Sequence, residues 1–408
     1  MSASPAWPLR PIFSRFSEPG ALKRKPPQPA QYNWIRECFE EPSEQLLLDL
    51  PPRPEIDPAY DDQVSLLVTE NGTQLFVSGF GLSLGKQSER VAIRHKRKVV
   101  AQIPFLRLQE VIIGSRGVNV TSDVIEALCE RGIRLAFLGG TGRPYALLTS
   151  PLITATVETR KAQIHAIDSP VGVNMARWIV AGKTRNQAKL LQYFARNRTE
   201  EQAEKFKAAA LSIKQITKKV LAIEGPDCRT VRPTLQGLEG AAGRLYWAAI
   251  SNVVPGIAPG TFSRHNPPTD VITATVNSAL NYGYGILTSH VWGAVMNAGL
   301  EPFAGLIHTD RSGKPSLVLD LIEEFRQPIV DRPLFGWLAK GGTPTLLGGL
   351  LDTETKEAVA MRVIGRLSAL EPHRGKEHQV RSIIQMQARL AASAFRQLKE
   401  YKPFSFQW

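Results

Sequence analysis

The sequence predicts an α+β protein in which a small N-terminal β-rich domain is followed by a larger all-α domain. Short runs of β-branched and aromatic residues, separated by turn residues, dominate residues 63–152. Apolar residues recur with helical spacing from about residue 156, so residues 153–408 are expected to be α-helical. Residues 1–62 hold 12 of the 29 prolines, which excludes long helices and central strands there.

The elements of the first two regions follow in order. Residues 1–62 are expected to form a loosely ordered, proline-rich extension with one short helix near residues 34–39. The runs SLLVTE and QLFVSG flank an Asn71-Gly72 pair, which predicts a β-hairpin. The strands continue through RVAIRH, VVAQIP and EVIIGS, DVIEALCERG predicts a single helix, and IRLAFLGG and YALLTS complete the β-rich domain.

The helical region is rich in basic residues. Its long periodic segments include ARWIVAGKTRNQAKLLQYFARNR, EEQAEKFKAAALSIKQITKKVLAIE and the final VRSIIQMQARLAASAFRQLKEY. Lysine and arginine crowd the stretches KTRNQAK, ARNR and KQITKK. A run of lysines on a helix is usually a solvated face, but repeated basic faces also fit a surface that follows phosphate groups.

Composition excludes several classes of protein. No apolar run approaches the ~20 residues that a membrane helix needs, and prolines interrupt the N-terminus where a signal peptide would be apolar. We therefore expect a cytoplasmic protein without a membrane partner. Three widely spaced cysteines predict neither a disulfide framework nor a zinc site. Residues 1–62 carry a net charge of −3, so the rest must carry +16 for a total of +13, which favours nucleic acid as a partner.

The segment TLQGLEGAAGRLYWAAI places Glu239 among small residues. On a helix, Glu239 shares a face with Ala242, Gly243 and Tyr246, and the small residues would let a second helix approach. An unpaired carboxylate at such a contact is costly, and a cation would relieve that cost. The alternative, which the spacing alone favours, places Glu239 in the first turn of a helix, facing solvent and complementing the helix dipole.

In the segment GLIHTDRSGKPSLVLDLIEEFR, a histidine is followed, after a polar turn, by an apolar run that carries three carboxylates. His308 ends an apolar run, where a hydrogen-bonded core residue is commoner than a metal ligand, and both roles stay open. Asp320, Glu323 and Glu324 lie opposite an apolar stripe, either as a solvent-exposed acidic face or as charges whose repulsion an ion relieves. Two carboxylates and an imidazole would suit Mg²⁺ or Mn²⁺, which could polarise a phosphodiester. Periodicity does not choose between Glu323 and Glu324.

Longer stretches carry a resemblance to a known family. They are SLLVTENGTQLFVSG, VIIGSRGVNVTSDVIEALCERGIRLAFLGGTGRPYALL, ARWIVAGKTRNQAKLL, LEGAAGRLYW, NPPTDVITATVNSALNYGYGILTSHVWGAVMNAGLEPFAGLIHTDRSGKPSLVLDLIEEFRQPIVDR, IIQMQARLAASAF and YKPF. Over roughly residues 63–408 the chain resembles the CRISPR-associated adaptation endonuclease/integrase family, the larger of the two near-universal CRISPR adaptation proteins.

The resemblance implies a β-rich dimerisation domain and an α-helical catalytic domain that binds Mg²⁺ or Mn²⁺. It implies homodimers that flank a dimer of the smaller adaptation protein. It also implies the insertion of short foreign segments of double-stranded DNA into a CRISPR array by transesterification.

The resemblance also assigns residues. The family's metal ligands match Glu239, His308 and Glu323, which selects Glu323 over Glu324, and Asp320 matches an acidic position that implies an auxiliary ligand. The resemblance also makes three residues candidates for contacting DNA phosphates or for supporting the site, namely Arg244, Arg264 and Asn266.

One motif departs from the family. The family often has an asparagine three residues after the aspartate of its PP-x-D motif, where this chain has Thr273, with Asn277 four residues further on. Two alternatives to integration remain from the sequence. One is a metal-dependent nuclease that acts on branched DNA in repair, and the other is a non-catalytic nucleic-acid-binding scaffold.

Overall fold

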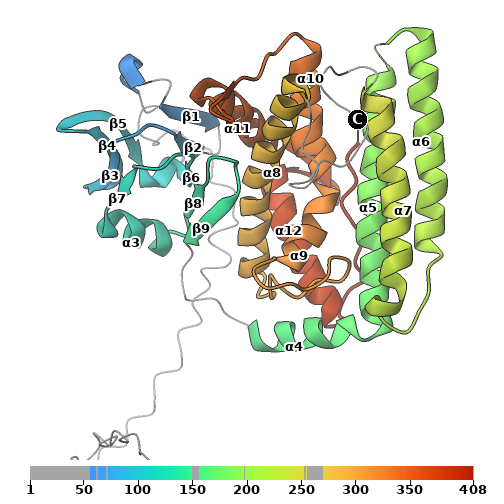
Figure 1. The fold of residues 1–408 in the computed structure, drawn as a ribbon. Coiled ribbons are helices and arrows are strands. Elements are labelled where there is room, and N and C mark those ends of the chain that lie inside the picture. Colours follow the sequence, from blue (N-terminus) through green and yellow to red (C-terminus); the bar gives the residue numbers. More distant parts are fainter. Residues whose placement is uncertain are drawn as a thin grey trace, which may run out of the picture. The chain divides into compact units, whose positions relative to one another are not determined.

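The computed structural model describes residues 56–60, 63–69, 72–148, 156–196, 198–251, 254 and 270–407. Within these ranges an N-terminal β region precedes a mostly helical part, as the sequence predicts (Figure 1). The short helix expected near residues 34–39 lies outside the described residues.

The β region contains two sheets and one α-helix. Its elements are β1 (Val64–Thr69), β2 (Gly72–Val77), β3 (Leu82–Gln87), β4 (Arg90–His95), β5 (Lys98–Pro104), β6 (Leu108–Ile113), β7 (Asn119–Val120), α3 (Ser122–Glu130), β8 (Arg134–Leu138) and β9 (Pro144–Leu148). One sheet has the order β1-β2-β6-β8-β9 and the other β5-β4-β3-β7. Strands β2, β6 and β8 run parallel, and α3 packs on β3 and β8.

The predicted hairpin is confirmed as the antiparallel pair β1–β2. Val64 lies opposite Val77, and Thr69 lies opposite Gly72. Gly72 is therefore a strand residue, and Asn71, the other residue of the expected turn, lies outside the described residues. At the start of this region, Ile56 bridges to β5, so the described end of the proline-rich extension contacts the sheet.

The C-terminal part consists mainly of helices. They are α4 (Thr156–Ile167), α5 (Pro170–Ala195), α6 (Glu200–Leu221), α7 (Cys228–Ser251), α8 (Val271–Asn297), α9 (Ser316–Leu321), α10 (Arg332–Ala339), α11 (Thr353–Ser368) and α12 (Val380–Phe395). A 3₁₀ turn (Ile322–Glu324) and a π-helical turn (Gln327–Asp331) join α9 to α10. None of the helices in the described ranges is both long and apolar enough to cross a membrane.

The expectation that this part is all-α is wrong. Two hairpins interrupt it, β10 (Leu346–Leu347) with β11 (Leu350–Leu351), and β12 (Leu370–His373) with β13 (Lys376–Gln379). The turn of the first has φ of +59° and +79° at Gly348 and Gly349, and the turn of the second has +52° and +82° at Arg374 and Gly375. Two successive residues with positive φ are typical of tight hairpin turns and cannot continue an α-helix.

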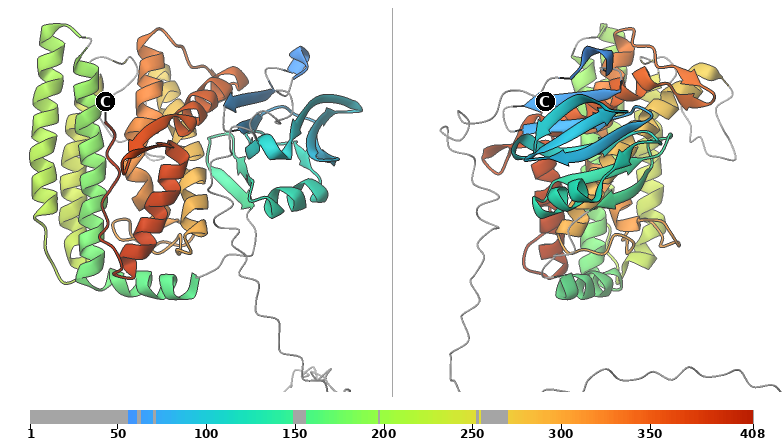
Figure 2. Two further views of the ribbon diagram at one scale, coloured as in Figure 1. Left: turned by 180° about the vertical axis from the view of Figure 1, so that it is seen from behind. Right: turned by 90° about the vertical axis from the view of Figure 1, so that its left-hand side faces the viewer.

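Helices α5, α6 and α7 stand side by side, and α4 crosses one end of this layer (Figures 1 and 2). Helix α8 packs against α11 and α12 and carries most of its residues in the core. The C-terminal segment, in dark red, runs along α5 (Figure 1), where Asn186 accepts a hydrogen bond from the backbone N–H of Phe406.

The β region is fixed to α8 by close packing and by buried charge. A Cβ on Gly285 would lie 1.8 Å from the carbonyl oxygen of Gly142, so the two backbones meet only because Gly285 has no side chain. Nearby, Glu110 pairs with Arg134 and, at 2.9 Å, with His290 Nε2 of α8. Burial alone would raise the pKa of Glu110, but these two partners hold it at about 2.

Candidate functional site

The His308 loop is built around the carboxylate of Asp320, which is fully buried in α9. Asp320 Oδ2 accepts hydrogen bonds from the backbone N–H groups of Leu306 (2.6 Å) and Ile307 (3.1 Å). Asp320 Oδ1 accepts from the backbone N–H of His308 (2.9 Å). The loop comes this close because Gly305 has no side chain, since a Cβ there would lie 3.0 Å from Asp320 Oδ2. Asp320 therefore anchors the loop and is not part of a solvent-exposed acidic face.

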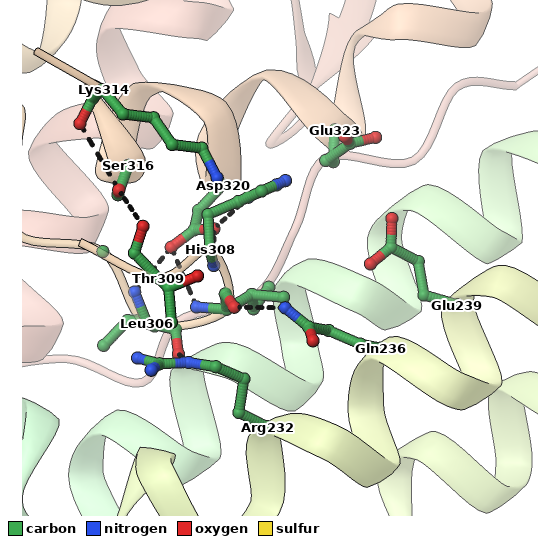
Figure 3. Close-up of polar contacts among 12 residues, drawn as sticks. Arg232, Gln236, Glu239, Leu306, His308, Thr309, Lys314, Ser316, Asp320 and Glu323 are labelled. Atoms are coloured by element: carbon green, nitrogen blue, oxygen red, sulfur yellow. Dashed lines mark hydrogen bonds and ion pairs between the residues drawn. The ribbon is translucent and has the colours of Figure 1, made fainter. Parts of the chain in front are cut away.

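The same carboxylate orients the imidazole of His308. Asp320 Oδ1 lies 2.7 Å from His308 Nδ1 (Figure 3). A carboxylate at this position favours the tautomer with its proton on Nδ1, which leaves Nε2 as the ligand nitrogen. Burial would lower the pKa of His308, but the hydrogen bond and the charge of Asp320, with a contribution from Glu323, outweigh it and raise that pKa. The side chain is 26% exposed, so it remains accessible.

Helix α7 brings Glu239 to this loop. Arg232 Nε and Gln236 Nε2 donate to the carbonyl oxygens of the two residues before His308, at 3.2 and 2.9 Å. Glu239 lies about one turn further along the same side of α7 (Figure 3). Because α7 begins at Cys228, Glu239 is a mid-helix residue, and its side chain is only 19% exposed. The first-turn, solvent-facing alternative for Glu239 is therefore wrong.

Lys183 of α5 joins Glu239 to Glu323. Its Nζ donates to Glu239 Oε1 at 2.5 Å and lies 2.7 Å from Glu323 Oε2. Glu323 Oε1 accepts from Arg326 Nη1 at 3.0 Å, whereas Oε2 is buried without hydrogen-bond geometry to any described group. Burial would raise the pKa of Glu323, but the charges of Arg326 and Lys183 lower it to about 2. Glu323 is therefore ionised at neutral pH.

Glu324 has a different role from its neighbour. Its buried carboxylate accepts hydrogen bonds from the hydroxyl of Tyr401, from the backbone N–H of Phe404 (2.7 Å) and from Gln387 Nε2 (3.3 Å). Burial raises its pKa to about 7 in spite of these donors. Glu324 thus ties the 3₁₀ turn after α9 to the C-terminal segment, and Glu323 is the acidic side chain that shares Lys183 with Glu239.

The arrangement fits a divalent ion only after a rearrangement. As the side chains stand, no three His, Cys, Asp or Glu residues within the described ranges are close enough to hold one ion. Two carboxylates and an imidazole are nevertheless a donor set that suits Mg²⁺ or Mn²⁺. Lys183 also shows that the space between Glu239 and Glu323 accepts a cation. Figure 3 shows His308, Glu239 and Glu323 around one region, approached from different elements.

The resemblance also makes Arg244, Arg264 and Asn266 candidates for DNA contact. Arg244 is exposed on α7, while Arg264 and Asn266 lie outside the described residues. Their roles in DNA contact stay predictions.

The PP-x-D segment ends in a helix cap. Asp270 Oδ1 accepts the backbone N–H of Thr273 at 2.7 Å, which satisfies an N–H group in the first turn of α8. Asn277 Nδ2 donates to the carbonyl of Thr273 at 2.8 Å. These contacts give Thr273 and Asn277 a structural role in the first turns of α8.

The basic stretch of α5 is not a solvated face. Lys183 is ion-paired, Arg185 stacks over Trp178 at 5.0 Å, and Lys189 Nζ donates to the carbonyl of Phe406 at 2.6 Å. In α6, by contrast, Lys205, Lys207, Lys214, Lys218 and Lys219 are exposed. Lys183 was missed by the sequence analysis. Its signal is a lysine that directly follows the apolar and small run from Ile179 to Gly182, all of which is buried in α5.

Comparison with known proteins identifies relatives over most of the chain. The family described as "CRISPR associated protein Cas1" matches residues 75–360. A CRISPR-associated endonuclease Cas1 from Korarchaeum cryptofilum is 32% identical over 293 residues, covering 71% of this chain and 84% of that protein. One from Pyrobaculum aerophilum is 36% identical, covering 66% and 85%, and one from Archaeoglobus fulgidus is 30% identical, covering 82% and 100%.

Solved structures show the same fold at lower identity. A casposase bound to integration product has a TM-score of 0.66 at 20% identity, covering 81% of this chain and 93% of that chain. A Cas6-RT-Cas1–Cas2 complex has a TM-score of 0.63 at 20% identity, covering 84% of this chain and 37% of that chain. A Cas1 protein from Thermotoga maritima has a TM-score of 0.62 at 18% identity, covering 81% and 99%.

Proposed function

The chain belongs to the Cas1 family of CRISPR-associated proteins, and from this premise we propose that it is a metal-dependent DNA endonuclease and integrase that inserts short foreign DNA segments into a CRISPR array. The observation that supports this proposal most is the arrangement of charged side chains around Lys183. The carboxylates of Glu239 and Glu323 face one buried cation, beside a histidine that a buried aspartate orients.

Glu239, Glu323 and His308 Nε2 are the side chains that would hold Mg²⁺ or Mn²⁺. When bound, the ion would supply positive charge to the attacked phosphodiester and lower the pKa of the attacking hydroxyl. Asp320 keeps the proton of His308 on Nδ1, so that Nε2 can act as a ligand. Because only neutral imidazole ligates, activity is expected to fall as the pH drops through the titration of His308.

The reaction that we propose is a transesterification. A 3′-hydroxyl of the incoming DNA attacks a phosphorus atom in the repeat and loses its proton. A new P–O bond forms as the bond to the 3′ oxygen of the repeat strand breaks, and that oxygen takes up a proton to become a 3′-hydroxyl, so the number of phosphodiester bonds is unchanged. With water as the nucleophile, the same chemistry gives endonuclease cleavage.

The proposed partners follow from the charge of the chain and from its family. Double-stranded DNA would be held by its phosphates, for which the exposed lysines of α6 are candidates. We also propose that the β region forms a homodimer and that the chain assembles with the smaller CRISPR adaptation protein. One similar structure is a complex that contains Cas1 and Cas2.

A strand-transfer assay tests the proposal. It combines a short duplex bearing free 3′-hydroxyls, a supercoiled plasmid with the native leader and repeat, and the purified smaller partner. Wild type, His308→Ala and the control His378→Ala are compared with Mg²⁺, Mn²⁺ and EDTA. His378 is a suitable control because it is a histidine outside the proposed ligand set, on β13, where its ring contacts His373.

We expect joining at the repeat by wild type and His378→Ala that depends on the metal and is absent with His308→Ala. Joining that survives both EDTA and His308→Ala would refute the metal site. Tight DNA binding without joining in any lane would favour a non-catalytic scaffold. Metal-dependent cleavage in a parallel reaction on branched DNA, without joining in the assay above, would favour a repair nuclease.

A further inference from the structure

Lys183 is a buried lysine whose partners are two proposed metal ligands. Its side chain is 11% exposed, and its Nζ lies within 2.7 Å of one oxygen of Glu239 and one of Glu323. The adjacent Gly182 packs against Pro403, where a Cβ would lie 2.6 Å away, so this part of α5 is held tightly against the C-terminal segment. The position of Lys183 is therefore fixed by packing as well as by charge.

The ion pairs explain why a charged lysine is stable here. Burial alone lowers the pKa of Lys183, but the charges of Glu323 and Glu239 outweigh it and raise that pKa. Without the ammonium, two carboxylates would face each other, and Arg326 pairs with Glu323 but not with Glu239. Removing one partner of a buried charge pair leaves the other uncompensated, which is strongly destabilising.

A divalent ion would need the same oxygens. Mg²⁺ binds carboxylate oxygens at about 2.0–2.1 Å, and an ammonium that touches the same two oxygens fills the space between them. This accounts for the absence of a closed three-residue ligand group among the described residues even though Glu239, Glu323 and His308 face one region. The ammonium and the metal ion exclude each other.

We infer that Lys183 is an internal cation that holds the metal-free site together and must be displaced when a divalent ion binds to Glu239 and Glu323. The inference rests on the proposed function, because it takes these two carboxylates as metal ligands. Lys183 is then a positioning residue for the metal-free site. Its ammonium group competes with the metal ion for the two carboxylates and so lowers the affinity for the ion. Removing its charge should therefore tighten metal binding.

The test measures Mn²⁺ binding to the full-length protein by electron paramagnetic resonance, together with the melting temperature with and without Mn²⁺. Lys183→Met removes the charge, and Lys183→Gln removes it while keeping amide donors for the carboxylates. Lys189→Met is the matched control, because Lys189 is on the same helix and half-buried but donates to a backbone carbonyl. Glu323→Gln reports the loss of a ligand.

We expect Lys183→Met or Lys183→Gln to bind Mn²⁺ about tenfold more tightly than wild type, because the metal ion then no longer has to displace the ammonium from the two carboxylates. Lys189→Met should bind Mn²⁺ as wild type does. Without metal, the Lys183 variants should melt below wild type, and Mn²⁺ should raise their melting temperature more than that of wild type. If wild type binds Mn²⁺ and neither Lys183 variant binds it more tightly, the competition is refuted and the proposed function stands. If wild type binds Mn²⁺ no better than Glu323→Gln, the metal site itself is refuted, and the inference with it.

Discussion

Asp320→Asn tests the network that holds the proposed ligand His308. The carboxylate of Asp320 accepts four hydrogen bonds, three from backbone N–H groups and one shared with His308 Nδ1. An asparagine side chain has a single acceptor oxygen, so it can face either the two donors at Oδ2 or the two at Oδ1. On the other side, its NH₂ group would confront donors, and at least one buried N–H would lose its partner.

The loss of stability expected for Asp320→Asn follows from these contacts. A buried donor left without a partner costs about 1–3 kcal/mol, so we expect Asp320→Asn to lower the free energy of unfolding by about 3 kcal/mol. The pKa of His308 should fall as well, because Asp320 is the main group that raises it while burial lowers it. The histidine would then stay neutral to lower pH, but an NH₂ group facing Nδ1 would move the ring proton to Nε2 and block ligation.

Urea unfolding of the metal-free protein measures the first effect, and NMR titration of the histidine side chains measures the second. Asp310→Asn is the control, since Asp310 is exposed in the same loop and accepts one backbone hydrogen bond, from Gly305 at 3.2 Å. An Asp320→Asn protein with the stability of wild type and an unchanged His308 titration would refute this account of the loop.

Two further predictions concern buried carboxylates away from the proposed ligand set. The pKa of Glu324 is raised to about 7 from an ordinary 4.5, so wild type should lose about 3 kcal/mol of stability as the pH rises from about 4.5 through 7. Glu324→Gln should make that slope shallower in unfolding measurements between pH 5 and 8, and an unchanged slope would contradict the burial argument. The pH dependence of stability that Glu110 contributes has the opposite sign, because its pKa is lowered to about 2. Its stabilising contribution is present above about pH 4.5 and is lost as the pH falls toward 2. Glu110→Gln should therefore destabilise the protein by about 3 kcal/mol at neutral pH, with the deficit shrinking in acid, and an equal deficit at all pH values would count against the ion pair with Arg134.

The order of β and helical segments could be predicted from the sequence because it depends on local patterns. Alternating and β-branched runs gave the strands, and 3.6-residue spacing gave the long helices. The two hairpins within the helical part were missed because each strand has only two to four residues, too few for a period to emerge. In the sequence, these hairpins are marked by the glycines of their turns, Gly348 and Gly349 in the first and Gly375 in the second.

Exposure of the charged residues could not be predicted in the same way. Helical spacing placed Asp320, Glu323 and Glu324 opposite the apolar stripe, and such a face is usually solvated. In the structure all three are buried, because other segments cover that face. Asp320 meets the His308 loop, Glu323 meets Lys183 and Arg326, and Glu324 meets the C-terminal segment.

The proposed ligands are separated widely in sequence, and the contacts that bring them together are not made by the ligands themselves. Arg232 and Gln236 of α7 hold the carbonyl oxygens of the His308 loop, and this fixes the distance between that loop and Glu239. Arg326 fixes one oxygen of Glu323, and Asp320 fixes one nitrogen of His308. Each proposed ligand thus keeps its remaining donor atom directed at the shared region without a metal ion. Among the residues that the structure describes, Lys183 is the group whose charge occupies the space between the two carboxylates, so the affinity of this site for a divalent ion should depend on how readily that side chain can leave.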